Sequence, residues 1–230
     1  AEFRGAQFSG DARFREAQFS DSAEFHGAQF SGDAHFEKAQ FRGSASFEKA
    51  QFRGRASFEK ARFSGNASFE KARFSGDAWF PEARFSGRAD FREAQLSDVA
   101  DFREVQFSRD AWFLSAQFSG FAWFSGTQFS SEARFDEAQF RGDADFSGAA
   151  ALSDGGNGGE ARGLSDRFHF VSFAGARFSD LGHVRFTNRR FLEKTDFIRT
   201  VFGCAPEFHN CVLHQDTDFT GPEFQDTSGD

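Results

Sequence analysis

The sequence predicts an all-β fold, a β-helix in which short strands stack coil upon coil. Two observations predict it. Phe occurs 38 times in 230 residues while Tyr and Met are absent, and one dominant large side chain indicates one repeated packing environment. Between Phe3 and Phe146 the Phe residues follow one another at alternating steps of five and six residues, and Leu96 takes the one remaining place in the series. The period is therefore eleven residues.

Each repeat unit reads A-x-F-x-x-A-x-F-x-x-x, as in AQFSGDARFRE at residues 6–16. An α-helix does not fit, because steps of five and six residues at about 100° per residue send successive Phe side chains to opposite sides of its axis. In an extended strand, residues i and i−2 share a face, so Ala and Phe point inward and the residue between them points outward. The residues after Phe, often Ser-Gly or Glu-Lys, then turn the corner.

The units AQFSG, ARFSG and AEFHG resemble the pentapeptide-repeat family, in which a small residue, a polar residue and Leu or Phe precede two polar or Gly residues. The resemblance covers about residues 1–151 and returns at about 166–224. It implies a right-handed quadrilateral β-helix with four short faces per coil. Because this sequence inserts one residue at every second corner, each coil is expected to contain about 22 residues instead of 20.

A two-sided β-solenoid with 11-residue coils fits the same periodicity and is the structural alternative. It would stack Glu37, Glu48 and Glu59 directly upon one another, and like charges opposite each other in adjacent strands are unfavourable. Four faces per coil halve each such ladder, so the charge pattern favours the four-sided form.

Three segments are predicted along the chain. They are a regular Phe-centred β-helix at 1–151, a Gly-rich projecting loop at 152–166, and less regular β-helix coils with a tail at 167–230. Phe168 and Phe173 return in the original eleven-residue phase, which indicates that the loop replaces one whole coil. The loop supplies four candidate contact residues: Asp154, Asn157, Glu160 and Arg162.

Gln occupies the outward position of every second strand, where neighbouring amides are expected to exchange hydrogen bonds along the stack. Arg62, Arg73 and Arg84 replace Gln in this series and form a candidate basic strip that could meet an anionic partner. Nearby Glu side chains, such as Glu59 and Glu82, are expected to neutralise part of its charge.

Large apolar side chains also occupy outward or corner positions, where Ser, Asp, Glu or Arg is usual in this sequence. They form a candidate interaction patch, which consists of Trp79, Trp112, Leu114, Phe121 and Trp123. In a four-sided coil Trp112 and Trp123 would face opposite directions.

The sequence contains no candidate catalytic site. The six His residues are dispersed, and no nucleophile, base and orienting group recur at related positions, so we expect no enzyme and no cofactor. Cys204, His209, Cys211 and His214 are residue types that bind zinc. In the repeat register Cys211 points inward whereas the two His point outward, so we expect no metal site there.

The composition limits the kinds of partner that this protein is expected to bind. There are 27 Lys and Arg against 35 Asp and Glu, and a net charge of -8 is poorly suited to direct contact with nucleic acid. No run of 18 apolar residues occurs, so no membrane insertion by this segment is expected. Two Cys residues favour a reducing, cytoplasmic location. We therefore expect a non-catalytic structural or protein-interaction module whose protein partner is unknown.

The family resemblance implies an alternative function. Acidic, rod-shaped relatives mimic DNA, bind DNA gyrase or another topoisomerase and modulate inhibitor sensitivity, and the net charge fits this pattern. The tail at 208–230 resembles the end of repeat domains in larger bacterial membrane proteins, which implies a soluble repeat domain tethered through residues outside this segment. An uncapped β-helix end exposes a sheet edge, so a homodimer through such an end is also expected.

Overall fold

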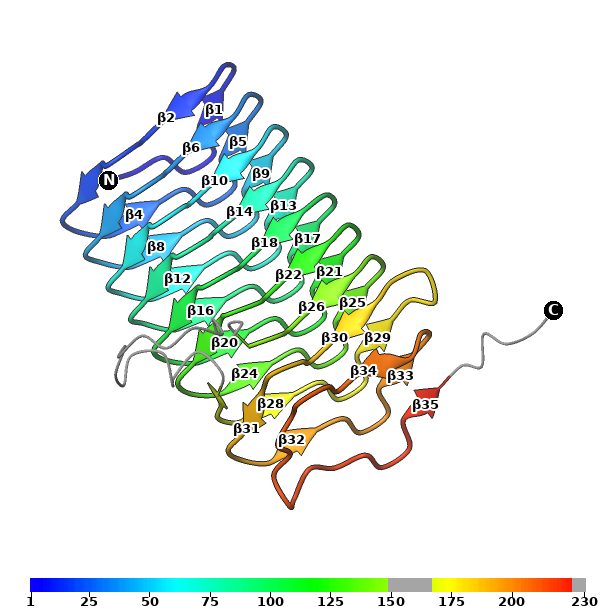
Figure 1. Cartoon of the computed structure of the whole chain (residues 1–230). Coiled ribbons are helices and arrows are strands. Elements are labelled where there is room, and N and C mark those ends of the chain that lie inside the picture. The colour runs from blue at the N-terminus through cyan, green and yellow to red at the C-terminus, as the bar shows by residue number, and fades with distance from the viewer. Residues whose placement is uncertain (149–166, 225–230) are drawn as a thin grey trace, which may run out of the picture.

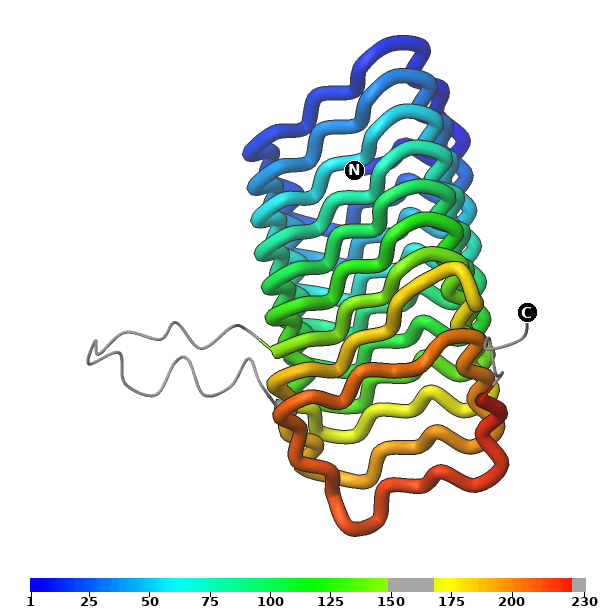
Figure 2. Tube along the Cα trace, turned by 45° about the vertical axis from the view of Figure 1, so that its right-hand side comes forward, coloured from blue at the N-terminus to red at the C-terminus, as the bar shows by residue number. Residues whose placement is uncertain are grey.

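The structure is a computed structural model that describes residues 1–148 and 167–224. Four parallel β-sheets surround one apolar core, and the coils stack into an elongated rod (Figure 1). The chain crosses the sheets, here called sheets 1, 2, 3 and 4, in a fixed order and returns to sheet 1 one coil further along (Figure 2). Sheets 1 and 3 therefore lie on opposite sides of the rod, as do sheets 2 and 4.

Sheets 1 and 3 contain the strands with Gln or Arg at the outward position, except that the last two strands of sheet 1 have Val201 and Glu223 there. Sheet 1 comprises β1 (Gln7–Phe8), β5 (Gln29–Phe30), β9 (Gln51–Phe52), β13 (Arg73–Phe74), β17 (Gln95–Leu96), β21 (Gln117–Phe118), β25 (Gln139–Phe140), β29 (Arg177–Phe178), β33 (Val201–Phe202) and β35 (Glu223–Phe224). Sheet 3 comprises β3 (Gln18–Phe19), β7 (Gln40–Phe41), β11 (Arg62–Phe63), β15 (Arg84–Phe85), β19 (Gln106–Phe107), β23 (Gln128–Phe129), β27 (Arg167–Phe168) and β31 (Arg190–Phe191).

Sheets 2 and 4 contain the strands that begin at the inward small residue. Sheet 2 comprises β2 (Ala12–Arg13), β6 (Ala34–His35), β10 (Ala56–Ser57), β14 (Ala78–Trp79), β18 (Ala100–Asp101), β22 (Ala122–Trp123), β26 (Ala144–Asp145), β30 (Val184–Arg185) and β34 (Pro206–Glu207). Sheet 4 comprises β4 (Ala23–Glu24), β8 (Ala45–Ser46), β12 (Ala67–Ser68), β16 (Ala89–Asp90), β20 (Ala111–Trp112), β24 (Ala133–Arg134), β28 (Val171–Ser172) and β32 (Thr195–Asp196).

The strand register fixes the length of a coil. In the regular array each strand pairs in parallel with the fourth strand after it, so that Gln7 lies beside Gln29 and Gln18 lies beside Gln40. The hydrogen bond from Asp33 N to Asp11 Oδ1 joins successive coils and spans the same 22 residues. The predicted four-sided coil is confirmed. The 11-residue alternative is wrong, because Gln7 and Gln18 belong to different sheets.

The core consists of Phe stacks. On sheet 3 the rings of Phe41, Phe63 and Phe85 stack with 4.7 and 4.6 Å between successive centroids, and their planes differ by at most 2°. Between sheets, rings meet edge to face, as Phe36 and Phe47 do at 5.3 Å and 85°. These side chains are at most 1% exposed. The small inward Ala residues leave room for the rings of sheets 2 and 4 to meet across the core, as Phe36 and Phe47 do.

Two kinds of corner alternate around the coil. After sheets 2 and 4 the chain turns through a residue in the left-handed region, such as Gly27 with φ 64° or Lys38 with φ 57°. After sheets 1 and 3 the turn has one more residue and brings successive coils into close contact. A Cβ at Gly43 would lie 2.6 Å from the backbone of Asp21 and Ser22. Gly therefore allows a positive φ at the first kind of corner, and at the second kind it allows the backbones of successive coils to approach closely.

The register after the break differs from the sequence expectation. A loop that replaced one whole coil would pair Phe168 with Phe146, but Phe168 pairs with Phe129 in sheet 3. Phe173 stacks on Phe135 with 5.1 Å between ring centroids. The phase agreement was misleading, because the inserted length equals one repeat period plus the longer of its two steps. Because of this shift, Phe168 and Phe173 keep their places in the numerical series of Phe positions, but each lies on a strand of the other type.

Candidate functional site

The three Trp residues lie on two opposite sides of the rod, as the four-sided coil predicts. Trp79 and Trp123 occupy sheet 2, where each is a register partner of Asp101. Trp112 occupies sheet 4 beside Asp90. Leu114 follows at the corner that leaves sheet 4 and is also far from the sheet 2 group. The sequence-predicted patch is therefore divided in two.

Each Trp ring is covered by an Arg side chain. The guanidinium carbon of Arg55 lies 4.7 Å from the ring centroid of Trp79, and that of Arg103 lies 4.8 Å from the centroid of Trp123. Trp112 is covered in the same way by Arg88, at 4.5 Å. Cation–π contacts of this kind stabilise by about 0.5–1 kcal/mol at exposed sites. The indole faces are thus partly occupied by this chain itself.

An ion pair between a half-exposed Arg and a buried carboxylate lies beside Trp123. The side chain of Asp101 is only 1% exposed although it occupies an outward position, and Arg103 Nη2 donates to its Oδ2 at 2.6 Å. Arg103 Nε donates to Oδ1 at 3.0 Å, so the contact is bidentate. This hydrogen bonding raises the pKa of the Arg103 guanidinium above its ordinary value.

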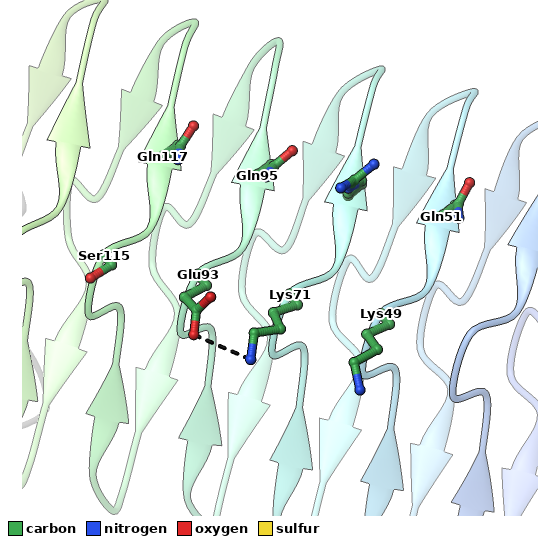
Figure 3. A pocket seen from close by; sticks show the side chains of 8 residues that line it. Lys49, Gln51, Lys71, Glu93, Gln95, Ser115 and Gln117 are labelled. Carbon is green, nitrogen blue, oxygen red and sulfur yellow. Dashed lines mark ion pairs between the residues drawn. The ribbon is translucent and has the colours of Figure 1, made fainter.

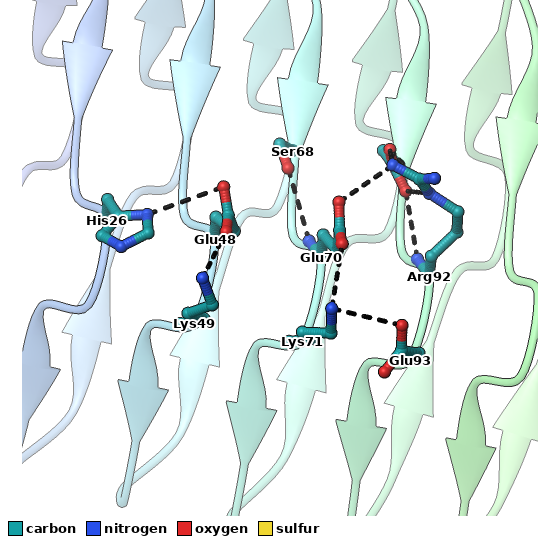
Figure 4. Close-up of polar contacts among 9 residues, drawn as sticks. His26, Glu48, Lys49, Ser68, Glu70, Lys71, Arg92 and Glu93 are labelled. Carbon is teal, nitrogen blue, oxygen red and sulfur yellow. Dashed lines mark hydrogen bonds and ion pairs between the residues drawn. The ribbon is translucent and has the colours of Figure 1, made fainter.

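The motif ADFRE occurs twice, at 89–93 and 100–104, and so places the same pair on opposite sides of the rod. On sheet 4, Arg92 Nη2 donates to Asp90 Oδ2 at 2.7 Å and to Glu70 Oε2 at 2.9 Å (Figure 4). Arg92 also lies 5.3 Å from the Trp112 ring centroid. In each case Trp stands one coil after Asp, a spacing that could have revealed the pairing from sequence.

Phe121 distinguishes the sheet 2 group from its counterpart on sheet 4. It is 47% exposed, and its ring stacks on Trp123 with 6.1 Å between centroids. Val99 occupies the same corner one coil earlier. We call Val99, Phe121, Trp123 and Arg103 the Phe121 patch. It combines the exposed Phe121 ring, stacked on the half-buried Trp123, with a guanidinium held by Asp101, and such aromatic and Arg side chains contribute strongly to binding energy in protein interfaces.

A shallow groove of about 640 Å³ runs along sheet 1 parallel to the rod axis (Figure 3). One wall consists of left-handed corner residues, where Lys71 Nζ lies 3.3 Å from Glu93 Oε1. The opposite wall is the outward ladder of β9, β13, β17 and β21. The lining residues are Lys49, Gln51, Lys71, Arg73, Glu93, Gln95, Ser115 and Gln117. The sequence alone did not indicate this groove, because it depends on which corners become neighbours.

The expected basic strip is also divided. Arg62 and Arg84 are direct partners in β11 and β15 of sheet 3, whereas Arg73 lies in sheet 1 on the opposite side. The acidic residues nearby do not neutralise them, since Glu59 and Glu82 bind Lys60 at 3.1 and 3.2 Å.

The Gln ladders also differ from expectation. Within the residues that the structure describes, the Gln side chains of sheets 1 and 3 form no hydrogen bonds with one another or with other protein groups. The expected ladder of amide bonds is therefore wrong. Register alone places these side chains in rows, and their amides face solvent.

The remaining sequence candidates form no assembled site in the part of the chain that the structure describes. Asp154, Asn157, Glu160 and Arg162 lie outside the described residues. Within the described ranges, no group of three or more His, Cys, Asp or Glu is arranged to hold a metal ion. Burial raises the pKa of the Cys204 and Cys211 thiols, which disfavours the thiolate that metals bind. The Cys211 thiol donates to the carbonyl of Phe186.

Comparison with known proteins identifies the repeat. A family model described as pentapeptide repeats (9 copies) matches residues 3–51, 36–84, 47–95, 80–128, 91–139 and 102–150. A search of curated proteins found no match. Among solved structures, a trypsin-treated variant of QnrB1, described as a plasmid-mediated fluoroquinolone resistance protein, matches at 13% identity over 94% of this chain and 92% of that chain. The TM-score is 0.19, so this likeness supports no functional argument.

Proposed function

The chain belongs to the pentapeptide-repeat family, and on that premise we propose that it is a non-catalytic protein-interaction module. Its rod presents fixed side chains to a protein partner. Rigid presentation is favoured by the core, because the inward Phe and Ala side chains are almost fully buried from Ala23 to Phe146. A pre-organised surface loses little conformational entropy on binding, which favours affinity.

The observation that carries the proposal is the contact between Phe121 and Trp123. Phe121 is 47% exposed. The other large apolar side chains in residues 1–146 are half-buried or buried. Trp123 supports the Phe121 ring from one side, and Arg103 is held against Trp123 by Asp101. A partner that covers Phe121 would gain apolar burial without having to order any of these three groups.

A photo-crosslinking residue at position 121 tests the proposal in cells of the source organism, with the same residue at position 114 as a control. Leu114 lies at a corner on another side of the rod and is less exposed. The protein captured from position 121 is purified, and its affinity is measured for wild type, Phe121→Ser and Trp112→Ala. We expect Phe121→Ser to lose about tenfold or more in affinity, while Trp112→Ala binds as wild type does. Equal loss in both variants would contradict docking at the Phe121 patch.

The charge distribution gives less support to a DNA-mimicking gyrase binder. The outward positions of sheet 1 from β1 to β29, and of sheet 3 from β3 to β31, hold only Gln or Arg. Acidic residues at strand positions are confined, over the same length, to sheets 2 and 4. A phosphate-like potential around the rod would need acidic rows on more sides. A gyrase supercoiling assay separates the two functions, and inhibition at micromolar protein would favour the mimic.

Attachment to a membrane is a separate proposal that depends on the resemblance of the tail at 208–230. Within the described residues, no helix is long and apolar enough to cross a bilayer. We propose that the segment is the repeat domain of a larger bacterial protein, tethered on the cytoplasmic side by residues outside it. The native gene beyond Asp230 tests this: codons for hydrophobic helices would support it, and a stop codon would contradict it.

A further inference from the structure

Two arginines on sheet 3 lie side by side, and neither forms an ion pair with an acidic side chain among the described residues. Arg62 and Arg84 occupy the outward positions of β11 and β15 and are direct register partners. Adjacent strands are about 4.8 Å apart, so the two exposed side chains leave the sheet from neighbouring points. Gln40 and Gln106 occupy the outward positions of the strands on either side.

Two outward arginines on sheets 2 and 4 have acidic neighbours. Arg134 Nε lies 2.6 Å from Asp136 Oδ2, and Arg13 Nη2 lies 3.8 Å from Asp11 Oδ2. By contrast, within the described residues neither Arg62 nor Arg84 forms a hydrogen bond or an ion pair through its side chain. Like charges directly opposite in adjacent strands are destabilising. An anion bound between the two guanidinium groups would remove that repulsion.

Two serine hydroxyl groups beside the two arginines add further hydrogen-bond donors to this part of sheet 3. Ser64 and Ser86 follow the buried residues Phe63 and Phe85, and each lies on the same outward side as the Arg two positions before it. Backbone hydrogen bonds fix both rows: Ser64 N donates to the carbonyl of Phe41 and Ser86 N to that of Phe63, each at 2.8 Å. The two hydroxyls are exposed and have no partner among the described residues.

We propose that Arg62, Arg84, Ser64 and Ser86 form a binding site for a tetrahedral oxyanion, either inorganic phosphate or a phosphate monoester. A guanidinium donates two parallel N–H groups to two oxygens of the same anion, and these two oxygens form one edge of that anion. A carboxylate offers one such edge, whereas a phosphate offers separate edges to two guanidinium groups. A Ser hydroxyl can donate to one of the same oxygens, because each phosphate oxygen accepts more than one hydrogen bond. The site is on sheet 3, away from the Phe121 patch, and does not depend on the proposed protein docking.

Substitution by Gln provides a clean test, because Gln is the native residue at the same position in neighbouring coils, as at Gln40 and Gln106. The double variant Arg62→Gln/Arg84→Gln should therefore fold. Arg73→Gln is the matched control, since Arg73 has the same position on sheet 1 but lies between Gln51 and Gln95. Calorimetric titration with inorganic phosphate, at ionic strength held constant with NaCl, gives the affinity of each protein.

We expect phosphate to bind wild type and Arg73→Gln alike, and the double variant to bind about tenfold more weakly or not at all. Phosphate should also raise the melting temperature of wild type and of Arg73→Gln but not of the double variant. A phosphoserine peptide, compared with its serine counterpart, then distinguishes a phosphate ester from the free ion. Equal affinities in all three proteins, or acetate binding as tightly as phosphate, would overturn the proposal.

Discussion

Arg103 holds the carboxylate of Asp101 in a bidentate contact at 2.6 and 3.0 Å, and that carboxylate is buried although its strand position points away from the core. The burial comes from the coils on either side, which place Trp79 and Trp123 next to Asp101 in the sheet. An outward position on a β-helix is therefore not necessarily exposed. Its exposure depends on the residues one coil before and one coil after it.

Removal of the Asp101 charge should destabilise the rod. We expect Asp101→Asn to lower the free energy of unfolding by about 1–3 kcal/mol, because Arg103 loses its partner beneath Trp123. Asp145→Asn is the matched control. Like Asp101, Asp145 accepts the backbone N–H of the residue two positions on, at 2.9 Å from Ser147 N. Among the described residues it forms no ion pair with an Arg, since its register partner Arg185 binds Glu207 instead. Urea unfolding of both variants checks the difference, and equal costs would contradict it.

Core substitutions should separate ring volume from apolar character. Phe63 lies between Phe41 and Phe85 and is 1% exposed. We expect Phe63→Ala to cost about 3–5 kcal/mol, because neighbouring rings held by the register cannot close the cavity. Phe63→Leu should cost less than about 2 kcal/mol, since Leu96 occupies an equivalent place on sheet 1. Guanidinium denaturation measures both, and similar costs for Ala and Leu would argue against tight ring stacking.

The left-handed corners predict a stabilising substitution. Glu104 has φ 57° and forms no ion pair in the described part of the chain. Glu104→Gly should raise the free energy of unfolding by up to about 1 kcal/mol, because Gly adopts positive φ without strain. Ser125→Gly, one residue before Gly126 and outside the left-handed region, should be destabilising instead. Thermal melts of the two variants that shift in the same direction would refute this reading of the corner.

Acid should weaken the corner pairs. The hydrogen bond from Lys49 at 2.8 Å lowers the pKa of Glu48 below its ordinary value, against a smaller opposing effect of desolvation. A carboxyl group whose pKa is lower in the folded state stabilises above its unfolded pKa of about 4.5, and this contribution disappears as pH falls through the folded value. The pair is partly exposed, so we expect an effect below about 1 kcal/mol. Unfolding of Glu48→Gln, measured from pH 7 to pH 3, should show a smaller loss than wild type.

Local spacing was enough to predict the strands and the inward Ala and Phe, because both follow from strand geometry over a few residues. The preference for four faces came from the like-charge ladders and from the family resemblance. The pairings across coils were harder. Arg62 and Arg84 become neighbours while Arg73 does not, and this depends wholly on the coil length. The loop was misjudged for a related reason, since Phe168 kept its place in the number series while it changed strand type.

Every surface assignment made for this rod depends on the length of one coil, and one distance tests it. Gln18 and Gln128 both lie on sheet 3, five coils apart, on β3 and β23. Spin labels at these positions, in a Cys204→Ala/Cys211→Ala background, allow the distance to be measured by pulsed electron paramagnetic resonance. Five steps of about 4.8 Å predict about 24 Å between the labelled backbone positions. A distance of about 48 Å would mean that the coils are two-sided and half as long, and it would contradict the four-sided rod.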